Sequence, residues 1–398
     1  MKATTKAVIA LAILASLLSF VKFNHCRNAG WTSPDMYTHA CYSDITALYD
    51  QRNIADHSWP YLHGANSLEY PPITGVVAWA TSYLVFHESN PLIYFDLNAL
   101  LLALLFIALV IFIAKMKPEF WYLLPLSPAV IASLYINWDL WAVISAVMCI
   151  YLFDRGKYDW SALALGISVA TKFFPIILLL PIAAIFIRKS QHRELIRYSC
   201  YAALTWVLIN APCTIINFRG WWQFFDLNSK RGADWGSLWF FLDRIGINVS
   251  AINLLAVLLL ISGSAFYLTY LLGRKVAPTL AATAFIAVAI FTVASKVYSP
   301  QYVLWLTPLA VLALVNKSDR TAFWIWQGTE IIYHFAIWQV LATQEGTRFG
   351  LSESNYTFVV ALRLIALAYF CASLMRKSPA EYPPQSSEFL SSAADGYA

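Results

Sequence analysis

Residues 91–114 read PLIYFDLNALLLALLFIALVIFIA, an apolar stretch whose only charged side chain is Asp96. A helix needs about 20 apolar residues to cross the hydrocarbon layer of a bilayer, so this segment is long enough to span a membrane. Similar runs recur along nearly the whole chain. Hydrophobic residues make up 60% of its 398 residues and charged residues 12%, where soluble domains carry roughly 25% charged residues. The sequence therefore predicts one all-α, polytopic membrane domain.

Further candidate spans lie on both sides of this stretch. Together with 91–114 they are residues 3–23, 72–87, 119–136, 138–153, 158–174, 175–187, 197–216, 250–272, 277–296, 300–315, 321–341 and 355–375. The first follows a short basic start but no small-residue cleavage site closes it, so we interpret it as a retained span rather than a signal peptide. Lys and Arg residues flank the apolar runs, as expected for cytoplasmic loops. They do not form one basic face, which argues against a nucleic-acid partner.

These segments are thirteen candidate crossings. Each crossing changes the side of the membrane, so a cytoplasmic N-terminus and a cytoplasmic basic tail require an even number. We therefore expect about 12 transmembrane helices, with the short segment 72–87 as a partial or tilted element. The alternatives are segment 175–187, whose prolines Pro175 and Pro181 break a helix, or a violation of the charge rule at Lys115 and Lys117.

This topology places the two long polar loops, residues 24–71 and 217–249, on the outward side, each bearing a short amphipathic helix. The polar turns at 137–139, 173–175 and 298–301 fall on the same side. Ionisable groups at membrane depth are functional by default, so this one-sidedness predicts an outward active site acting on a lipid-borne substrate. The domain spans 1–375, and the Ser-, Pro- and acid-rich tail at 376–398 is predicted to be disordered and cytoplasmic.

Two of the six cysteines, Cys26 and Cys41, lie outside the apolar runs and within the first outward loop. We expect a disulfide between them, since an outward loop is on the oxidising side. Closure of a loop of this size stabilises by about 3 kcal/mol. Two free thiols are the alternative. The cysteine spacing matches no metal-binding motif.

The first loop contains CYSDITALYDQRN at residues 41–53. Ile45, Leu48 and Tyr49 fit one face of a short amphipathic helix with Asp44 near its start. Asp44 is the leading catalytic candidate, and the alternative is an N-cap that satisfies exposed amides for about 1 kcal/mol. Further along, Tyr70-Pro71-Pro72 restricts the backbone where the chain returns to the membrane and holds Glu69 at the interface.

These motifs form an ordered series: an acidic residue after the first span, the Tyr70-Pro71-Pro72 turn, NWD at 137–139, TKFFP at 171–175 and YSPQY at 298–302. The series resembles the GT-C glycosyltransferases. It is most similar to the actinobacterial polyprenol-phosphate-mannose-dependent α-1,2-mannosyltransferases and the related arabinofuranosyltransferases. The resemblance extends over most of the chain, and its specificity lies in the order of the motifs, because each motif alone is weak.

The resemblance implies transfer of a sugar, with mannose preferred, from a polyprenyl-phosphate donor to a glycolipid or glycan of the cell envelope. The reaction would take place on the outer face of the plasma membrane. Asp44 would occupy the position of the general base in an inverting single displacement, because the acceptor hydroxyl must lose a proton as it attacks. No cofactor and no metal are expected, since the acidic cluster of a magnesium or manganese site is missing.

A leaving phosphate requires cations or oriented donors. The candidates for binding it are Lys172, Arg231, Lys296 and His334. For Arg231 the alternative is a solvated loop charge, and for His334 a core residue bonded to a carbonyl.

Candidates for orienting the substrate are Asp139, Glu69, Tyr70 and Gln301. Asp139 could instead pair with Lys172. Glu330 and Arg363 are predicted to form a buried structural pair.

Two other classes of function remain open. A lipid-linked sugar flippase or transporter would also be polytopic, but it should show internal repeats, and none is evident. A scaffold subunit is the third possibility. In the second loop, Trp221, Trp222, Trp235 and Trp239 could stack on sugar or prenyl groups, or form an interfacial aromatic belt.

Overall fold

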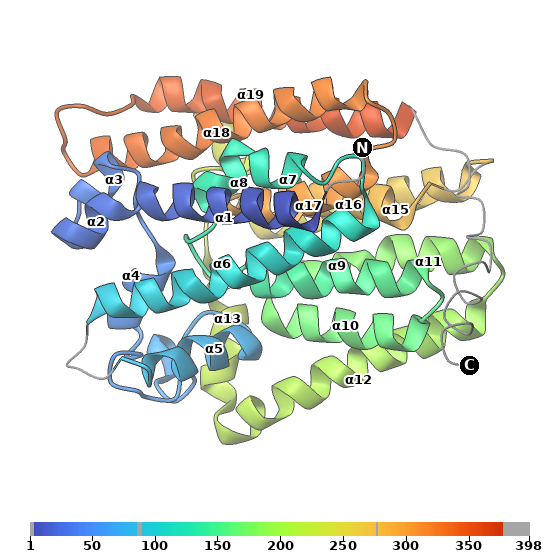
Figure 1. The fold of residues 1–398 in the computed structure, drawn as a ribbon, viewed down its shortest axis with the longest axis horizontal. Helices are drawn as coiled ribbons and strands as arrows, with labels where there is room; N and C mark the ends of the chain where they lie inside the picture. The colour runs from blue at the N-terminus through green and yellow to red at the C-terminus, as the bar shows by residue number, and fades with distance from the viewer. Residues whose placement is uncertain (1–3, 86–89, 276–277, 377–398) are drawn as a thin grey trace.

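The computed structural model describes residues 4–85, 90–275 and 278–376, and within these ranges the chain is all-helical, without a β-strand (Figure 1). The predicted tail after Arg376 lies outside the described residues. The first half of the chain forms α1 (Thr5–Lys22), α2 (Asn24–Ala29), α3 (Asp35–Thr38), α4 (Asp44–Gln51), η1 (Gly64–Asn66), α5 (Pro72–Ser82), α6 (Pro91–Met116), α7 (Leu123–Leu126), α8 (Pro128–Ser133), α9 (Leu140–Asp154), α10 (Tyr158–Thr171), η2 (Phe174–Leu178) and α11 (Leu179–Arg188).

The second half forms α12 (His192–Ile216), α13 (Phe218–Lys230), α14 (Leu238–Arg244), α15 (Ile252–Gly273), α16 (Leu280–Ala294), η3 (Pro300–Tyr302), α17 (Val303–Ala313), α18 (Asp319–Gln344) and α19 (Glu353–Arg376). Most of these helices run roughly along the long axis of the molecule (Figure 1).

Five helices of the described chain, α1, α6, α12, α15 and α19, are long and apolar enough to cross a membrane. Their apolar side chains are largely exposed: Ile215 of α12 is 82% exposed and Phe266 of α15 is 71% exposed. Such surfaces would be unfavourable in water and are expected in contact with lipid. The chain is therefore a multi-pass membrane protein. Shorter apolar helices, including α9 and α16, pack between the long ones.

The number of crossings remains a prediction. The structure defines the helices in the two segments, 72–87 and 175–187, that were expected to fall short of a full crossing. The segment 72–87 contains α5, whose 11 residues extend about 16 Å and cannot cross a hydrocarbon layer of roughly 30 Å. The segment 175–187 forms a 3₁₀ turn, η2, that continues into α11. Pro175 lies in the 3₁₀ turn and Pro181 in the first turn of α11, where a proline does not break a helix.

Helix starts in the polar segments carry the expected caps. The Thr4 side chain accepts from the Ala7 N–H at the start of α1, and Asn90 accepts from Leu92 and Ile93 ahead of Pro91 in α6. Asn217 accepts from the Gly220 N–H at the start of α13. These side chains satisfy amides that a helix leaves without partners.

The two long polar loops meet at one end of the bundle, which we call the loop end; it carries α2–α5 and α13, at the left in Figure 1. Asn217 donates to the Leu62 carbonyl at 3.1 Å and Gln223 donates to the Ala65 carbonyl at 2.9 Å. Gly220 lies so close to Tyr61 that an added Cβ would be 1.8 Å from the Tyr61 carbonyl oxygen. Helix α13 is thus seated directly on the first loop.

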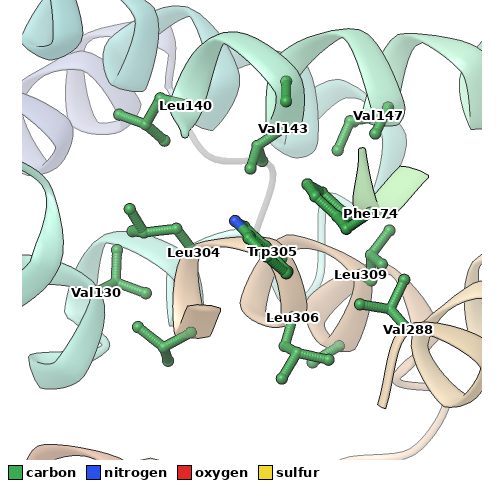
Figure 2. Packing of buried hydrophobic residues seen from close by; sticks show 14 of the residues in the cluster. Val130, Leu140, Val143, Val147, Phe174, Val288, Leu304, Trp305, Leu306 and Leu309 are labelled. Atoms are coloured by element: carbon green, nitrogen blue, oxygen red, sulfur yellow. The ribbon is translucent and has the colours of Figure 1, made fainter. Parts of the chain in front are cut away.

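The core at the middle of the bundle is close-packed and aromatic. Figure 2 shows Trp305 of α17 and Phe174 of η2 among Val143, Leu304 and Leu309. The two aromatic rings stack with centroids 4.1 Å apart. This stack fixes the orientation of the Trp305 indole, whose N–H donates to Asp139.

Candidate active site

Asp44 is the first residue of α4, and the backbone around it is bonded to the helical bundle. Its N–H donates to the Ile136 carbonyl at 2.7 Å, and the Ser43 hydroxyl donates to the Tyr135 carbonyl at 2.8 Å. Ser43, not Asp44, caps the helix by accepting from the Ile45 N–H. The N-cap alternative for Asp44 is therefore wrong, and its carboxylate is left for other contacts. The predicted amphipathic face of α4 is confirmed, with Ile45, Leu48 and Tyr49 buried.

Two tyrosine hydroxyls hold the partly exposed carboxylate of Asp44. Tyr42 donates to Oδ1 at 2.9 Å and Tyr70 donates to Oδ2 at 3.0 Å. The Asn137 amide lies 3.4 Å from the Tyr70 hydroxyl, so the NWD turn also contacts this group. The carboxylate is thereby fixed in orientation.

Burial raises the pKa of Asp44 above its ordinary value. The positive charge of Lys172 and the hydrogen bonds from Tyr42 and Tyr70 oppose that shift, and the negative charge of Asp139 adds to it. The pKa of Tyr70 lies well above its ordinary value, because of burial first and the negative charge of Asp44 next. Tyr70 therefore remains a hydrogen-bond donor, and Asp44 is the group able to accept a proton.

A cation and a second carboxylate lie beside Asp44. Lys172 Nζ is 2.9 Å from Asp139 Oδ1, so the ion pair considered in the sequence is confirmed. The Trp305 indole donates to Asp139 Oδ2 at 2.7 Å. The side chain of Asp139 is fully buried, whereas 16% of the Lys172 side chain is exposed. Lys172 Nζ also lies 4.2 Å from the centroid of the Tyr70 ring, so Tyr70 contacts both charged groups.

A small pocket opens next to Tyr70. Its walls come from the first loop, the end of α10, α12 and α13: Tyr70, Pro71, Pro72, Val169, Phe173, Trp206, Asn210, Trp221, Phe224 and Phe225. The lining is mostly aromatic or apolar, and Asn210 accepts from the Trp221 indole at 2.8 Å. The pocket is small, with room for about one water molecule, so it marks an aromatic wall beside Tyr70 rather than a formed sugar site.

Other predicted site residues are held nearby by their own contacts. Glu69 forms a bidentate pair with Arg52 at 2.6 and 3.0 Å. Gln301 is buried in η3, next in sequence to Tyr302. Tyr302 lies within electrostatic range of Asp139, Asp234 and Arg231.

Arg231 follows the last residue of α13 as its C-cap and lies close enough to the partly buried Asp234 to influence its pKa. Burial raises the pKa of Asp234, and the positive charge of Arg231 opposes the shift.

Two predicted phosphate-binding residues already use their polar atoms. Lys296 Nζ donates to the carbonyls of Ser229 and Arg231 and to Asn253 Oδ1, which accounts for all three ammonium protons. His334 is buried, with Nδ1 3.2 Å from the Ser133 hydroxyl and Nε2 3.4 Å from the Trp338 indole nitrogen. Both residues would have to exchange these contacts before binding a phosphate.

The predicted buried pair of Glu330 and Arg363 is confirmed at 2.9 Å. Arg363 lies between the rings of Tyr298 and Tyr333 and donates to the Tyr298 carbonyl at 2.7 Å. The Tyr298 hydroxyl donates to Glu330 at 2.8 Å. The pair therefore holds the YSPQY turn in place.

Cys26 and Cys41 form a disulfide that closes the start of the first loop, three residues before Asp44. Among the described residues, three metal-ligating side chains converge in one place, His25, Asp35 and His39, and that group includes neither Asp44 nor Asp139.

Sequence reasoning missed Tyr42 and Trp305 as partners of the two carboxylates. Tyr42 lies two residues before Asp44, and an aromatic residue so close to a candidate base is a usable signal. Trp305 is 166 residues from Asp139, and no local pattern connects them.

No family model matches the chain, and no curated protein matches it. Among solved structures, the fold is similar to that of ArnT from Cupriavidus metallidurans bound to undecaprenyl phosphate, at 14% sequence identity and a TM-score of 0.48. The match covers 94% of this chain and 77% of that one. Because both identity and score are low, we base no conclusion on this similarity.

Proposed function

We propose that the chain is a membrane glycosyltransferase that uses a polyprenyl-phosphate sugar, with mannose as the preferred sugar. The acceptor is a glycolipid or glycan of the cell envelope, and the reaction takes place on the outer face of the plasma membrane. The observation that carries the proposal is the Asp44 carboxylate, oriented by Tyr42 and Tyr70 beside the Lys172 ammonium and the aromatic pocket.

In the proposed reaction the acceptor hydroxyl oxygen attacks the anomeric carbon of the donor. The bond between that carbon and the phosphate oxygen breaks, and the polyprenyl phosphate departs with its electron pair. Asp44 takes the proton of the attacking hydroxyl and later releases it to solvent. Displacement from the opposite face inverts the anomeric configuration.

The surroundings of Asp44 support this assignment. A raised pKa makes a carboxylate a stronger base, and burial raises that of Asp44. Two fixed hydroxyl donors keep it oriented.

Lys172 is the best-placed cation for the donor phosphate, because its side chain is partly exposed and its ionic contact is with Asp139. Arg231 is the second candidate. Lys296 and His334 are weaker candidates because their polar atoms are engaged.

The test uses the purified chain in liposomes with labelled polyprenyl-phosphate mannose and total cell-envelope lipids. Asp44→Asn removes the base, and we expect transfer to fall by roughly 10²–10⁴-fold. Asp50→Asn is the matched control, since Asp50 lies in the same helix on an exposed position. Equal transfer by a folded Asp44→Asn protein would contradict the assignment of the base.

Two further arms separate the finer proposals. Transfer from a polyprenyl-phosphate arabinose donor, without transfer from the mannose donor, would change the sugar. Movement of labelled lipid across the bilayer without transfer from either donor would identify a transporter instead.

A further inference from the structure

A histidine, aspartate and histidine cluster lies in the first polar loop, where the proposed reaction does not use it. His25 Nε2 is 2.6 Å from Asp35 Oδ2, and His39 Nδ1 is 3.0 Å from Asp35 Oδ1. The ligand atoms of the three residues all lie within 4.8 Å of one another. His25 lies in α2, Asp35 is the first residue of α3, and His39 directly follows the last residue of α3. Two short helices therefore position the three side chains of the cluster.

The two imidazole rings are stacked face to face, with centroids 3.4 Å apart and planes 15° apart. Two imidazolium rings in this arrangement would repel each other, whereas two neutral rings can share one cation. Within the described residues the opposite nitrogens, His25 Nδ1 and His39 Nε2, carry no hydrogen bond. His39 Nδ1 also lies 3.2 Å from the backbone carbonyl oxygen of Asp35. Carbonyl and carboxylate oxygens accept, so without a metal the nitrogens that face Asp35 donate their ring protons. A bound metal replaces those protons, and the ring protons then lie on the opposite nitrogens.

We propose that His25, Asp35 and His39 form a binding site for a zinc-class divalent transition metal. Zinc takes imidazole nitrogen and carboxylate oxygen at about 2.0–2.2 Å, and three protein ligands leave a fourth position for water. Magnesium and calcium prefer sites built from oxygen, so two imidazoles select against them. This inference does not depend on the proposed glycosyl transfer.

The disulfide preorganises this site. Cys26 follows His25 directly and is bonded to Cys41, two residues after His39, so both histidines are held near each other before any metal binds. On the other side, Gln339 of α18 donates to the Thr38 carbonyl at 3.1 Å, which ties α3 to the bundle.

The nearest strong cation on α2 does not compete for Asp35. Arg27 forms its own pair with Asp96 of α6, with Nε 2.6 Å from Oδ1. The Asp35 carboxylate therefore remains available to a metal. The side chains of His25, Asp35 and His39 are 40%, 37% and 43% exposed, so an ion can reach them from solvent.

Sequence spacing gave no sign of this site. The ligands are separated by ten residues and then by four, and the close approach depends on the turn between α2 and α3. A bound metal would cross-link α2 to the segment that leads into Tyr42 and Asp44, in addition to the disulfide between Cys26 and Cys41.

The test measures zinc binding to the whole chain, purified in detergent without a histidine tag and stripped with a chelator. Competition with a chromophoric chelator gives the affinity, and elemental analysis after dialysis gives the stoichiometry. We expect one zinc per chain, no displacement by millimolar Mg²⁺, and at least ten-fold weaker binding in His25→Ala and His39→Ala. His63→Ala is the matched control, because His63 is an exposed histidine of the same loop.

Cobalt(II) provides a readout in the unaltered protein, so the test does not depend on how well a variant folds. We expect visible absorption bands from one bound cobalt that one equivalent of zinc abolishes. The proposal is overturned if the unaltered chain binds no stoichiometric zinc, or if His63→Ala loses as much affinity as His25→Ala.

Discussion

The Tyr70 hydroxyl donates to Asp44 Oδ2 at 3.0 Å, while the Tyr70 ring lies 4.2 Å from the Lys172 ammonium. The ring and the hydroxyl of one side chain thus serve different charges. The hydroxyl can be removed without removing the ring, so the two contacts can be tested separately.

Tyr70→Phe should lower transfer by roughly ten-fold, because it removes one hydrogen bond to a charged group, worth about 1.5 kcal/mol. The aromatic contact with Lys172 is kept. Initial rates in liposomes provide the measurement. Tyr83→Phe is the control, since its hydroxyl donates to the His57 carbonyl at an exposed position. A rate equal to that of the unaltered protein would show that the Tyr70 hydroxyl does not support the reaction.

The rate of transfer should fall on the acid side of its pH profile at a pH above the ordinary pKa of an aspartate. Burial raises the pKa of Asp44, and the carboxylate can accept a proton only when it is ionised. The Tyr70 hydrogen bond lowers this pKa, so Tyr70→Phe should move the acid limb to higher pH. An acid limb that stays in place or moves to lower pH in Tyr70→Phe would contradict this account.

The same shift has a consequence for stability. Because the folded-state pKa of Asp44 lies above the unfolded value, its protonation favours the folded state. This contribution is fully present below the unfolded pKa and is lost as the pH rises through the folded pKa. Asp44→Asn should remove that pH dependence, which thermal unfolding in detergent across a pH series can detect.

Lys172→Met should destabilise the protein by about 3–5 kcal/mol, because it leaves the fully buried carboxylate of Asp139 without its cation. Adding Asp139→Asn should recover part of that loss, since the unpaired charge is then gone. The midpoint of thermal unfolding in detergent is the measurement. Lys230→Met is the control: its pair with Asp226 is exposed, and such pairs contribute about 0–1 kcal/mol. Equal losses at both lysines would rule out a special role for burial.

Replacing Cys26 and Cys41 with alanine should cost about 3 kcal/mol, through the greater freedom of the unfolded chain. A reducing agent should lower the unfolding midpoint of the unaltered protein but leave that of the double variant unchanged. Cys200→Ala, at an exposed free thiol, should behave like the unaltered protein. If the reducing agent lowers the midpoint of the double variant equally, another process is responsible.

Local patterns in the sequence account for part of this architecture. The apolar face of α4 and the shortness of the 72–87 element each follow from spacing or composition within one segment, and the structure has both. The partnership of Glu330 with Arg363 joins two helices, and it follows from the cost of leaving either charge unpaired at membrane depth. The pairing of Asp139 with Lys172 was one of several alternatives, because a buried carboxylate needs a cation but the sequence does not say which one.

The contacts that shape the candidate site could not be predicted in the same way. Trp305 reaches Asp139 from a helix in the second half of the chain, and Tyr70 reaches Asp44 from 26 residues away. His334 and Lys296 are residue types expected of phosphate ligands, yet Ser133 and Asn253, from other helices, already contact their polar atoms. Long-range packing decides which polar atoms remain open, and a single sequence does not encode that information locally.

The hydrogen bonds of Asp44 and Ser43 to the carbonyls of Ile136 and Tyr135 attach the start of α4 to the transmembrane scaffold. The bundle therefore sets the position of the Asp44 carboxylate, the proposed base, although Asp44 lies within a surface loop. On the proposed function, substitutions or insertions in the exposed stretch around His63 to Asn66 would change the surface offered to an acceptor without moving Asp44. Such an arrangement would let related chains diverge in acceptor preference while keeping one reaction geometry.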